Sequence, residues 1–423
     1  MITTRPRGTA DILPEDAGRW RYVEDMFRKI CLEYNYLEIR TPIFEHTELF
    51  ERGVGDTTDI VEKEMYTFLD RGERSVSLRP EGTAPVVRAF LENSLYSGPQ
   101  PVKLYYMGPM FRYDKPQAGR YRQFHQLGVE VLGSPHPAVD AELIAMVMDF
   151  YGRLGLKDLE LHINSVGCPG CRSVLRQELL DFFRPRLDKL CKNCSGRYGR
   201  NPLRILDCKE KTCREISTSA PTTLDCLCPE CERHFSLVKE YLDSLGVTYQ
   251  VDNRLVRGLD YYTHTAFEIM TPDIGSQSSI GGGGRYNGLI EACGGPAVPG
   301  VGYALGMERI LLAMKSQEAY LPAVDRPDVF VVSAGPGCEK EAFKLLYHLR
   351  RGGLSADMDY MGRSLKAQMK FAGKTGCRYV VILGGDELKR KAAGVKDMTS
   401  GSQVEMPLDN LAEEIKKSIH GGK

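Results

Sequence analysis

Residues 111–133 have the sequence FRYDKPQAGRYRQFHQLGVEVLG, and this stretch says more about the architecture than any other. With the residues before it, it predicts two strands, 102–112 and 121–132, that form a hairpin around a polar loop. Side chains alternate along a strand, so one face of the second strand carries Arg122, Phe124, Gln126, Gly128 and Glu130. This face is either the solvent-facing side of an antiparallel sheet or a surface that binds a ligand.

Helices are expected before and after this hairpin in the chain. Residues 15–36 carry apolar side chains at steps of three and four, which predicts a helix with one apolar stripe. A short strand over 37–41 follows and ends at Pro42, and residues 139–153 form a second expected helix. The pattern predicts an antiparallel hairpin with one helix before it and one after it in the chain.

A separate unit follows a polar, proline-containing linker at 316–327. Two strands, 329–332 and 379–383, alternate with helical segments that end in a helix over 409–419, which predicts a compact α/β unit. Residues 327–423 contain 16 Lys and Arg against 12 Asp and Glu. This modest excess fits either a solvated surface or a contact surface for a phosphate backbone.

The composition excludes some classes of protein. The 423 residues contain 56 Lys and Arg and 56 Asp and Glu, which excludes a wholly basic nucleic-acid binder but not a local basic face. A hydrophobic content of 42% excludes a disordered chain. Neither an apolar signal region nor a run of about 18 apolar residues is present, so we expect a cytoplasmic protein without a membrane span.

Three arginines and a run of glycines point to a polyphosphate ligand. Arg112 ends the first strand of the hairpin, Arg257 lies in LVRGLDYYT, and Arg309 follows GVGYALG at the start of a helix. Arginine is a planar, permanently charged donor, and a helix start adds backbone N–H groups. The glycines at 281–284 form either a flexible loop or a backbone that approaches a ligand closely, with Tyr286 as a wall. No Walker A or dinucleotide-binding motif is present.

Several segments together resemble a class II aminoacyl-tRNA synthetase of the histidyl-tRNA synthetase family. The resemblance covers nearly the whole chain in the family's order. It includes the helix and strand that end at Pro42, LRPEGT at 78–83, the hairpin at 111–133, LVRGLDYYT at 255–263, GGGGRYNGL at 281–289 and GVGYALGMERILL at 300–312. The resemblance implies an α+β catalytic domain, built on an antiparallel sheet flanked by helices, with a helical insertion and a C-terminal α/β anticodon-binding domain.

The resemblance implies four arginines that bind ATP. Arg112 would hold the α-phosphate and Arg309 the γ-phosphate. Arg257 would lie opposite Arg112, in the place of a catalytic metal. Arg120, in the loop of the hairpin, would help to hold ATP or the acceptor end of the tRNA. Three of these residues, Arg112, Arg257 and Arg309, would stabilise the transition state, and ATP would enter with Mg²⁺.

The resemblance also implies the residues that bind L-histidine. One group would hold the α-amino group and position the substrate: Glu81, Gly82, Thr83 and Gln126. Glu130 and Tyr262 would bind the two imidazole nitrogens, and Tyr261 would line the pocket. Polar recognition of this kind can reject apolar competitors by about 10⁴ or more, so no editing domain is expected.

The expected domains and partners follow from the same resemblance. The catalytic domain spans 1–165 and 249–320, the cysteine-rich helical insertion spans 166–248, and the anticodon-binding domain spans 327–423. The expected function is histidine–tRNA ligation by a homodimer that acts on L-histidine, ATP and tRNA(His). The insertion falls where the family places a segment near the acceptor arm of the tRNA.

Nine of the 13 cysteines lie between Cys168 and Cys231. In a reducing compartment such a block favours metal binding or free thiols over disulfides. The pairs Cys168–Cys171 and Cys191–Cys194 have the spacing of a structural zinc site. The alternative is a set of reduced thiols in a small helical insertion, and the spacing does not say which cysteines combine.

Three other functions remain open from the sequence. The first is a binding protein, the synthetase-like regulatory subunit of ATP phosphoribosyltransferase in histidine biosynthesis, which lacks the full signatures and the anticodon domain. The second is a class II synthetase for proline, threonine or glycine, although Glu130 with Tyr262 suits an imidazole. The third is a zinc-dependent RNA-binding module, which leaves the arginines unexplained.

Overall fold

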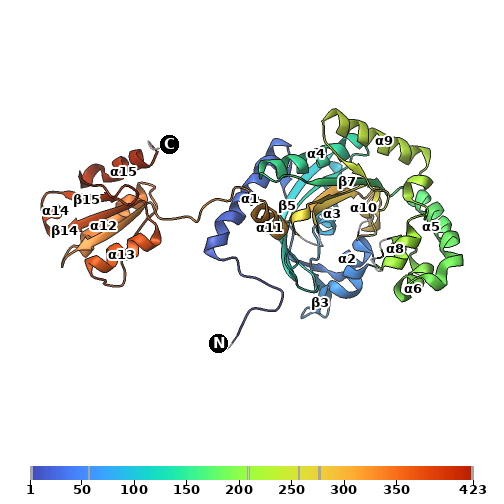
Figure 1. Cartoon of the computed structure of the whole chain (residues 1–423), viewed down its shortest axis with the longest axis horizontal. Helices are drawn as coiled ribbons and strands as arrows, with labels where there is room; N and C mark the ends of the chain where they lie inside the picture. The colour runs from blue at the N-terminus through green and yellow to red at the C-terminus, as the bar shows by residue number, and fades with distance from the viewer. Residues whose placement is uncertain are drawn as a thin grey trace. The chain divides into compact units, whose positions relative to one another are not determined.

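The computed structural model describes residues 3–55, 58–206, 208, 210–255, 258–274 and 278–420. The chain divides into two compact units, Met1–Pro322 and Ala323–Lys423 (Figure 1). Each unit has its own sheet and its own hydrophobic core. None of the helices in the described part of the chain is long and apolar enough to cross a membrane.

The larger unit is built on an eight-stranded sheet whose six inner strands pair antiparallel. The two edge strands pair parallel with their neighbours. In spatial order the strands are β1 (Leu37–Glu38), β5 (Val102–Phe111), β6 (Gln123–Leu132), β11 (Gly300–Gly306), β10 (Ser279–Arg285), β9 (Thr263–Met270), β7 (Glu160–Ser165) and β8 (Gln250–Val251). The predicted hairpin is confirmed as β5 and β6, and the expected antiparallel sheet is present.

Helices cover one face of this sheet and form its main core. They are α1 (Pro14–Glu33), α4 (Pro137–Arg153), α9 (Pro229–Ser244) and α11 (Met307–Ser316). The apolar stripe predicted for the first helix is buried at Val23, Phe27 and Ile30. From β6, Leu127 and Val129 join this core. Figure 1 shows α4 on this side of the sheet, with α2 and β3 on the other.

The opposite face of β6 carries the polar residues of the hairpin and is also covered. Gln126 is 9% exposed and Glu130 is 1% exposed. The cover comes from α3 (Thr83–Glu92) and α10 (Leu289–Ala292), which form a second core with Tyr106 and Tyr286. The solvent-facing alternative for this face is therefore wrong at Gln126 and Glu130, because segments distant in sequence bury them.

The glycine run is a strand, so the flexible-loop alternative is wrong. Gly281 to Gly284 lie in β10 and pair with β11 on one side and β9 on the other. The strands approach so closely that a Cβ on Gly283 would lie 2.1 Å from the carbonyl oxygen of Gly302. Strand β10 therefore requires glycine at this position for packing against its own neighbours.

A smaller sheet and a short helix lie on the side of the large sheet that α3 covers. The sheet contains β2 (Phe44–His46), β4 (Ser75–Leu78) and β3 (Tyr66–Leu69), in that order. The helix α2 (Thr47–Val54) packs against α3 through Phe50 and Val54, which join Ala84 in a small core.

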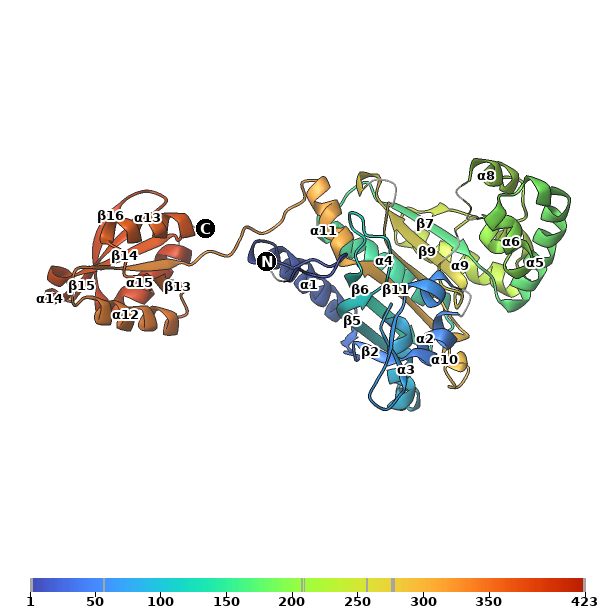
Figure 2. The same cartoon turned by 90° about the horizontal axis from the view of Figure 1, so that it is seen from below.

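The insertion between β7 and β8 is helical, as predicted. Figure 2 shows α5, α6 and α8 as a group beyond β7. The helices are α5 (Pro169–Phe183), α6 (Lys192–Arg200), α7 (Leu203–Leu206), α8 (Lys211–Ser217) and α9, which returns to the main core. A small hydrophobic cluster holds the first four together, and two of its eight buried members are Cys194 and Cys213.

The C-terminal unit is the α/β fold that the sequence predicted. Its sheet has the order β13 (Ala356–Met358), β12 (Val329–Ala334), β14 (Tyr379–Gly384), β15 (Ala392–Asp397) and β16 (Gln403–Pro407). Strands β13, β12 and β14 are parallel to one another. Strand β15 pairs antiparallel with β14, and β16 pairs antiparallel with β15. The helices are α12 (Glu339–Arg351), α13 (Leu365–Thr375), α14 (Gly385–Lys389) and α15 (Leu411–His420).

A buried ion pair fastens the end of β10 to α4. The guanidinium of Arg285 donates to both carboxylate oxygens of Asp140, and its Nη1 donates to the carbonyl of Ser134 at 2.7 Å. Both side chains are at most 1% exposed. Burial by itself would raise the pKa of Asp140, but Arg285 and His234 outweigh burial and lower this pKa to about 2.

Replacement of Asp140 by Asn should lower the free energy of unfolding by about 3–5 kcal/mol, because it leaves a buried guanidinium without its counter-charge. The lowered pKa makes the pair stabilising above about pH 4, and this stabilisation should be lost as the pH falls toward 2. Chemical denaturation at several pH values measures both effects.

The matched control is Asp149→Asn on the same helix, which breaks a partly exposed pair with Arg153. Its cost should be below about 1 kcal/mol. Equal losses in the two variants would show that the buried pair contributes no more than a surface pair.

Candidate active site

Two adjoining pockets open on the α3 side of the large sheet. The larger has a volume of about 500 Å³ and the smaller about 300 Å³. Four residues line both pockets: Arg112, Glu268, Gly282 and Ala304. A ligand could therefore extend from one pocket into the other past the Arg112 side chain.

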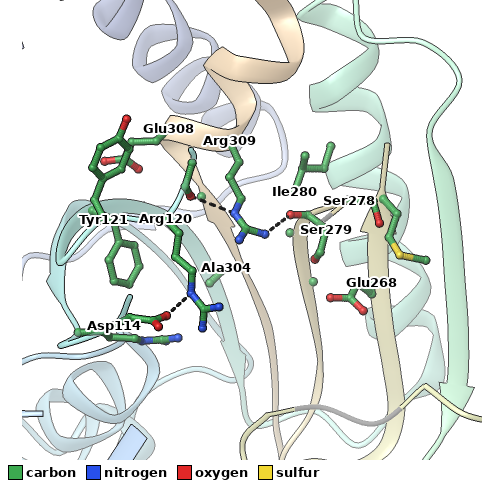
Figure 3. A pocket seen from close by; sticks show the side chains of 17 residues that line it. Asp114, Arg120, Tyr121, Glu268, Ser278, Ser279, Ile280, Ala304, Glu308 and Arg309 are labelled. Atoms are coloured by element: carbon green, nitrogen blue, oxygen red, sulfur yellow. Dashed lines mark hydrogen bonds and ion pairs between the residues drawn. The ribbon is translucent and has the colours of Figure 1, made fainter. Parts of the chain in front are cut away.

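The larger pocket is lined by three of the predicted arginines, Arg112, Arg120 and Arg309. Arg309 lies in the first turn of α11, where its Nε donates to the carbonyl of Gly119 at 3.1 Å and its Nη1 to that of Ser279 at 2.6 Å. Figure 3 shows the Arg120 and Arg309 side chains directed toward the same space. Burial, followed by repulsion from Arg120, lowers the pKa of Arg309, although arginine stays charged at neutral pH.

Backbone contacts and an aspartate orient the other two arginines. The Nε of Arg112 donates to the carbonyl of Pro80 at 2.8 Å, and its guanidinium lies 5.3 Å from the ring centre of Phe124. Arg120 forms an ion pair with Asp114 across the hairpin loop (Figure 3). Burial lowers the pKa of Arg112, so an anion that enters this pocket would meet a desolvated positive charge.

The fourth predicted arginine, Arg257, lies outside the described residues. Its neighbour in the chain, Gly258, lines the smaller pocket.

A buried carboxyl group, that of Glu130, lies behind the lining of the smaller pocket and bonds to two residues that line it. The Oγ1 of Thr83 donates to Glu130 at 2.8 Å, and the hydroxyl of Tyr286 donates to it at 2.5 Å. A Cβ on Gly302 would lie 1.8 Å from the Oε2 of Glu130, so only glycine fits there. Burial raises the pKa of Glu130 to about 8, against the opposing effect of these two donors.

A second carboxylate lies at the start of α3. Glu81 accepts from the backbone N–H groups of Thr83 at 2.7 Å and Ala84 at 2.8 Å, so it caps the helix. Burial raises its pKa, and the two amide donors act in the opposite direction. Gly82 lies between these residues and packs on Tyr106, whose ring would lie 2.2 Å from a Cβ at this position.

The remaining predicted residues line the same pocket. The Oε1 of Gln126 is buried and has no hydrogen-bond partner among the described residues. The rings of Tyr261 and Tyr262 lie 4.8 Å apart, and Tyr261 meets Tyr286 edge to face at 5.6 Å. The pocket therefore offers a free acceptor, carboxylates and an aromatic wall to a small polar cation or N–H donor.

Glu268 is the site residue that the sequence analysis missed. It comes from β9 and is the carboxylate that lines both pockets; Figure 3 shows it across the larger pocket from Arg120. The signal was a single acidic residue within the strand sequence THTAFEIM. The hydrogen bond from Tyr286 to Glu130 was also missed, because the two residues are 156 positions apart.

The structure separates the two cysteine pairs predicted to form one zinc site. Cys168 and Cys171 lie with Cys228 and Cys231. Cys191 and Cys194 form a different group, with Cys208 and Cys213. The four-residue set taken from the spacing is therefore wrong as one site, because the fold brings a different partner to each pair.

Comparisons with known proteins match this chain to histidyl-tRNA synthetases along its whole length. The family model for histidyl-tRNA synthetase matches residues 8–177 and 217–310, and that for the anticodon binding domain matches 328–418. The chain is 66% identical to a histidine–tRNA ligase of Pelotomaculum thermopropionicum over 100% of both chains. It is 67% identical to that of Desulforamulus reducens, over 98% of this chain and 99% of the other. The apo crystal structure of the Staphylococcus aureus histidyl-tRNA synthetase has a TM-score of 0.84 and 44% identity, covering 98% of this chain and 100% of the other.

The raised pKa of Glu130 predicts a dependence of stability on pH. Because the folded chain keeps this proton to about pH 8, against 4.5 ordinarily, the free energy of unfolding should fall as the pH rises through this range. Glu130→Gln mimics the protonated form. It should be more stable than the parent at pH 9 by a few kcal/mol and equally stable at pH 5.

Denaturant titrations across this pH range make the comparison. Glu51→Gln serves as the control because Glu51 is exposed. Parallel pH profiles for the parent and Glu130→Gln would contradict the raised pKa.

Proposed function

The chain belongs to the histidyl-tRNA synthetase family, and we propose that its two joined pockets are the histidine and ATP sites of a histidine–tRNA ligase. The activity is the formation of histidyl-adenylate and pyrophosphate from L-histidine and ATP, followed by transfer of histidine to tRNA(His). The observation that carries the proposal is Arg112, which lines both the carboxylate pocket and the arginine pocket. Identities of 66% and 67% to ligases along the whole chain favour this function over the regulatory subunit.

Histidine would occupy the smaller pocket. Glu130 and Tyr262 would contact the imidazole nitrogens, and Tyr261 would line the ring. The free Oε1 of Gln126 and the carboxylate of Glu81 would accept from the α-ammonium group, with Gly82 and Thr83 beside it. The burial of Glu130 supports this assignment, since a competitor without a polar side chain would leave that group desolvated and without a ligand contact.

ATP would occupy the larger pocket, with its α-phosphate at Arg112 and its γ-phosphate at Arg309. Arg120 would hold ATP or the acceptor end of the tRNA, and Arg257 would face Arg112 by family resemblance. Carboxylate oxygens are suitable ligands for Mg²⁺, and Glu268 presents one beside the arginines. Mg²⁺ would enter with ATP and offset the charge of its phosphates.

The chemistry then needs positioning and positive charge more than proton transfer. The histidine carboxylate attacks the α-phosphorus, its oxygen forms the new P–O bond, and pyrophosphate leaves. Negative charge develops on the phosphate oxygens, where Arg112 is already oriented by Pro80 and needs no rearrangement. In the second step a terminal hydroxyl of the tRNA attacks the histidyl carbonyl, and AMP leaves.

The tRNA would contact two regions. Residues 327–423 would form the anticodon-binding domain, which the match to the anticodon binding domain model supports. The insertion, residues 166–248, would approach the acceptor arm. Its segment 184–214 contains ten Lys and Arg against three Asp and Glu, which is suited to a phosphate backbone. The catalytic domain would comprise 1–165 and 249–320.

We also propose that the chain acts as a homodimer in the cytoplasm. Strand β1 is an edge strand of the large sheet, and large apolar residues are exposed in and around it and on the small sheet. They are Leu32, Leu37, Ile43, Phe44, Phe68 and Leu69, each at least 45% exposed. An exposed apolar edge of this kind is expected to be covered by a partner.

The cofactors proposed are ATP with Mg²⁺ and a structural zinc in the insertion. The cysteine thiols of the insertion support zinc, and none of them lines either pocket, so the metal would have no part in the chemistry.

The function is tested by ATP–pyrophosphate exchange with each of the twenty amino acids, followed by charging of total tRNA. We expect exchange with histidine alone and charging of one tRNA. Histidine binding without exchange or charging would contradict the ligase and favour the regulatory subunit.

Gln126→Met should raise the KM for histidine about tenfold, because a hydrogen bond to a charged group contributes about 1.5–3 kcal/mol. The KM for ATP should change less than twofold. Steady-state exchange kinetics measure both constants.

Gln123→Met is the matched control, since Gln123 lies in the same strand and lines neither pocket. An unchanged histidine KM in Gln126→Met would remove Gln126 from the amino-group site.

A further inference from the structure

The insertion contains two separate groups of four cysteines. The first, cluster I, comprises Cys168, Cys171, Cys228 and Cys231. The second, cluster II, comprises Cys191, Cys194, Cys208 and Cys213. Within each cluster all four Sγ atoms lie within 4.8 Å of one another.

The spacing of the sulfur atoms fits a tetrahedral metal ion. A zinc–sulfur bond of about 2.3 Å places two thiolates of a tetrahedron about 3.8 Å apart. The Sγ atoms of Cys168 and Cys171 are 3.6 Å apart, and those of Cys191 and Cys208 are 3.9 Å apart. Both separations are far longer than the roughly 2.05 Å of a disulfide.

Backbone N–H groups are directed at the sulfur atoms. In cluster I the N–H of Cys228 donates to the Sγ of Cys171 at 3.1 Å. In cluster II the N–H of Cys191 donates to the Sγ of Cys213 at 3.2 Å. Cys168, Cys191 and Cys228 are also the N-cap residues of α5, α6 and α9. Such positions stabilise thiolates, the form of cysteine that binds a metal.

The hydrophobic core of this region is small. Its buried members are Leu175, Leu179, Phe183, Leu190, Cys194, Ile205, Cys213 and Ala220, and nine partly buried apolar side chains pack against them. Small segments with so few buried side chains commonly depend on metal ions or disulfides. Cluster I joins the two ends of the insertion, at the starts of α5 and α9, and cluster II joins α6 to α8.

Each cluster also lies next to an arginine that contacts the segment 258–260, beside the smaller pocket. Arg172 follows Cys171, and its Nη1 donates to the carbonyl of Asp260 at 3.1 Å. Arg204, on the short helix before Cys208, lies 3.4 Å from the Oδ1 of Asp260 and from the carbonyl of Gly258. These contacts converge on the segment 258–260, which leads directly into Tyr261 and Tyr262.

A third contact links cluster I to β9, the strand that begins directly after Tyr262. The Sγ of Cys231 lies 3.6 Å from the Nδ1 of His264, and His264 pairs through its backbone with Gly167 at 3.0 Å. A change in cluster I would therefore reach β9 next to Tyr262.

We propose that the insertion binds two structural zinc ions, one in each cluster, and that these ions hold Arg172 and Arg204 against the segment that carries the pocket tyrosines. The assignment of two ions and of their ligands is argued from the two cysteine clusters alone. The link to the tyrosines rests on the histidine site proposed above. Each ion would hold together the helices that carry its cysteines, and so would fix the position of the backbone from which one arginine extends.

Elemental analysis of the tag-free, full-length protein tests the first part of the proposal, that the insertion binds two zinc ions. We expect two zinc ions per chain. The double variants Cys171→Ser/Cys231→Ser and Cys194→Ser/Cys213→Ser should each retain one. The control Cys226→Ser should retain two, because Cys226 lies in the same block but in neither cluster. Fewer than about 0.2 equivalents of zinc, a single equivalent in the parent, or iron in its place would overturn the assignment.

A second measurement does not depend on the folding of the variants. The parent chain, exchanged with Co²⁺, should show the charge-transfer and tetrahedral ligand-field bands of two tetrathiolate ions. A titration that saturates at one equivalent, or gives octahedral bands, would overturn the two-site assignment.

Kinetics of Arg172→Leu and Arg204→Leu test the second part of the proposal, the link between the zinc clusters and the pocket tyrosines. Both variants should keep two zinc ions while the KM for histidine rises about three- to tenfold and the KM for ATP changes less than twofold. Arg176→Leu is the matched control on α5, since its Nη2 donates to Gly199 within the insertion. An unchanged histidine KM would overturn the link alone. Absence of exchange in the parent would contradict the proposed function, and the zinc count would still be readable.

Discussion

The removal of Glu130 from water is the constraint on which the rest of the site depends. A carboxylate at 1% exposure is costly unless donors surround it, and the fold supplies two from Thr83 and Tyr286. These donors come from the start of α3 and from the residue after β10, which are far apart in sequence. The pocket therefore exists only when α3 packs on the sheet and β10 pairs with β11, the neighbour of β6. A ligand with N–H groups would recover part of the remaining cost, and an apolar ligand would not.

The neighbouring pocket follows a different principle. Its arginines are oriented chiefly through backbone carbonyl groups, at Pro80, Gly119 and Ser279. Neutral acceptors fix the direction of a guanidinium without cancelling its charge, so the field in the pocket is set before an anion enters. The larger pocket thus presents positive charge and the smaller one hydrogen-bond acceptors on either side of Arg112, where a carboxylate and a phosphate would have to meet.

The features that the sequence predicted well are local or periodic. The hairpin, the stripe of the first helix and the strands of the C-terminal unit follow from alternation within a few residues. Burial of Gln126 depends on α3 and could not be read from β6 alone. The pairing of Cys171 with Cys228, across 57 residues, is set by the path of the chain, whereas spacing shows only which cysteines are neighbours. The glycine run carries no side-chain pattern, so its place as a strand follows from its neighbours in the sheet.

The contacts around Gly283 and Gly302 also limit how this site could change during evolution. A side chain at Gly283 would meet the backbone of Gly302, and a side chain at Gly302 would meet the backbone carbonyl oxygen of Val129 as well as the carboxyl group of Glu130. Backbone atoms cannot be traded for smaller ones, so no single second-site substitution relieves either clash. Gradual divergence, which changes one residue at a time, should therefore leave both glycines unchanged even where the residues around them vary.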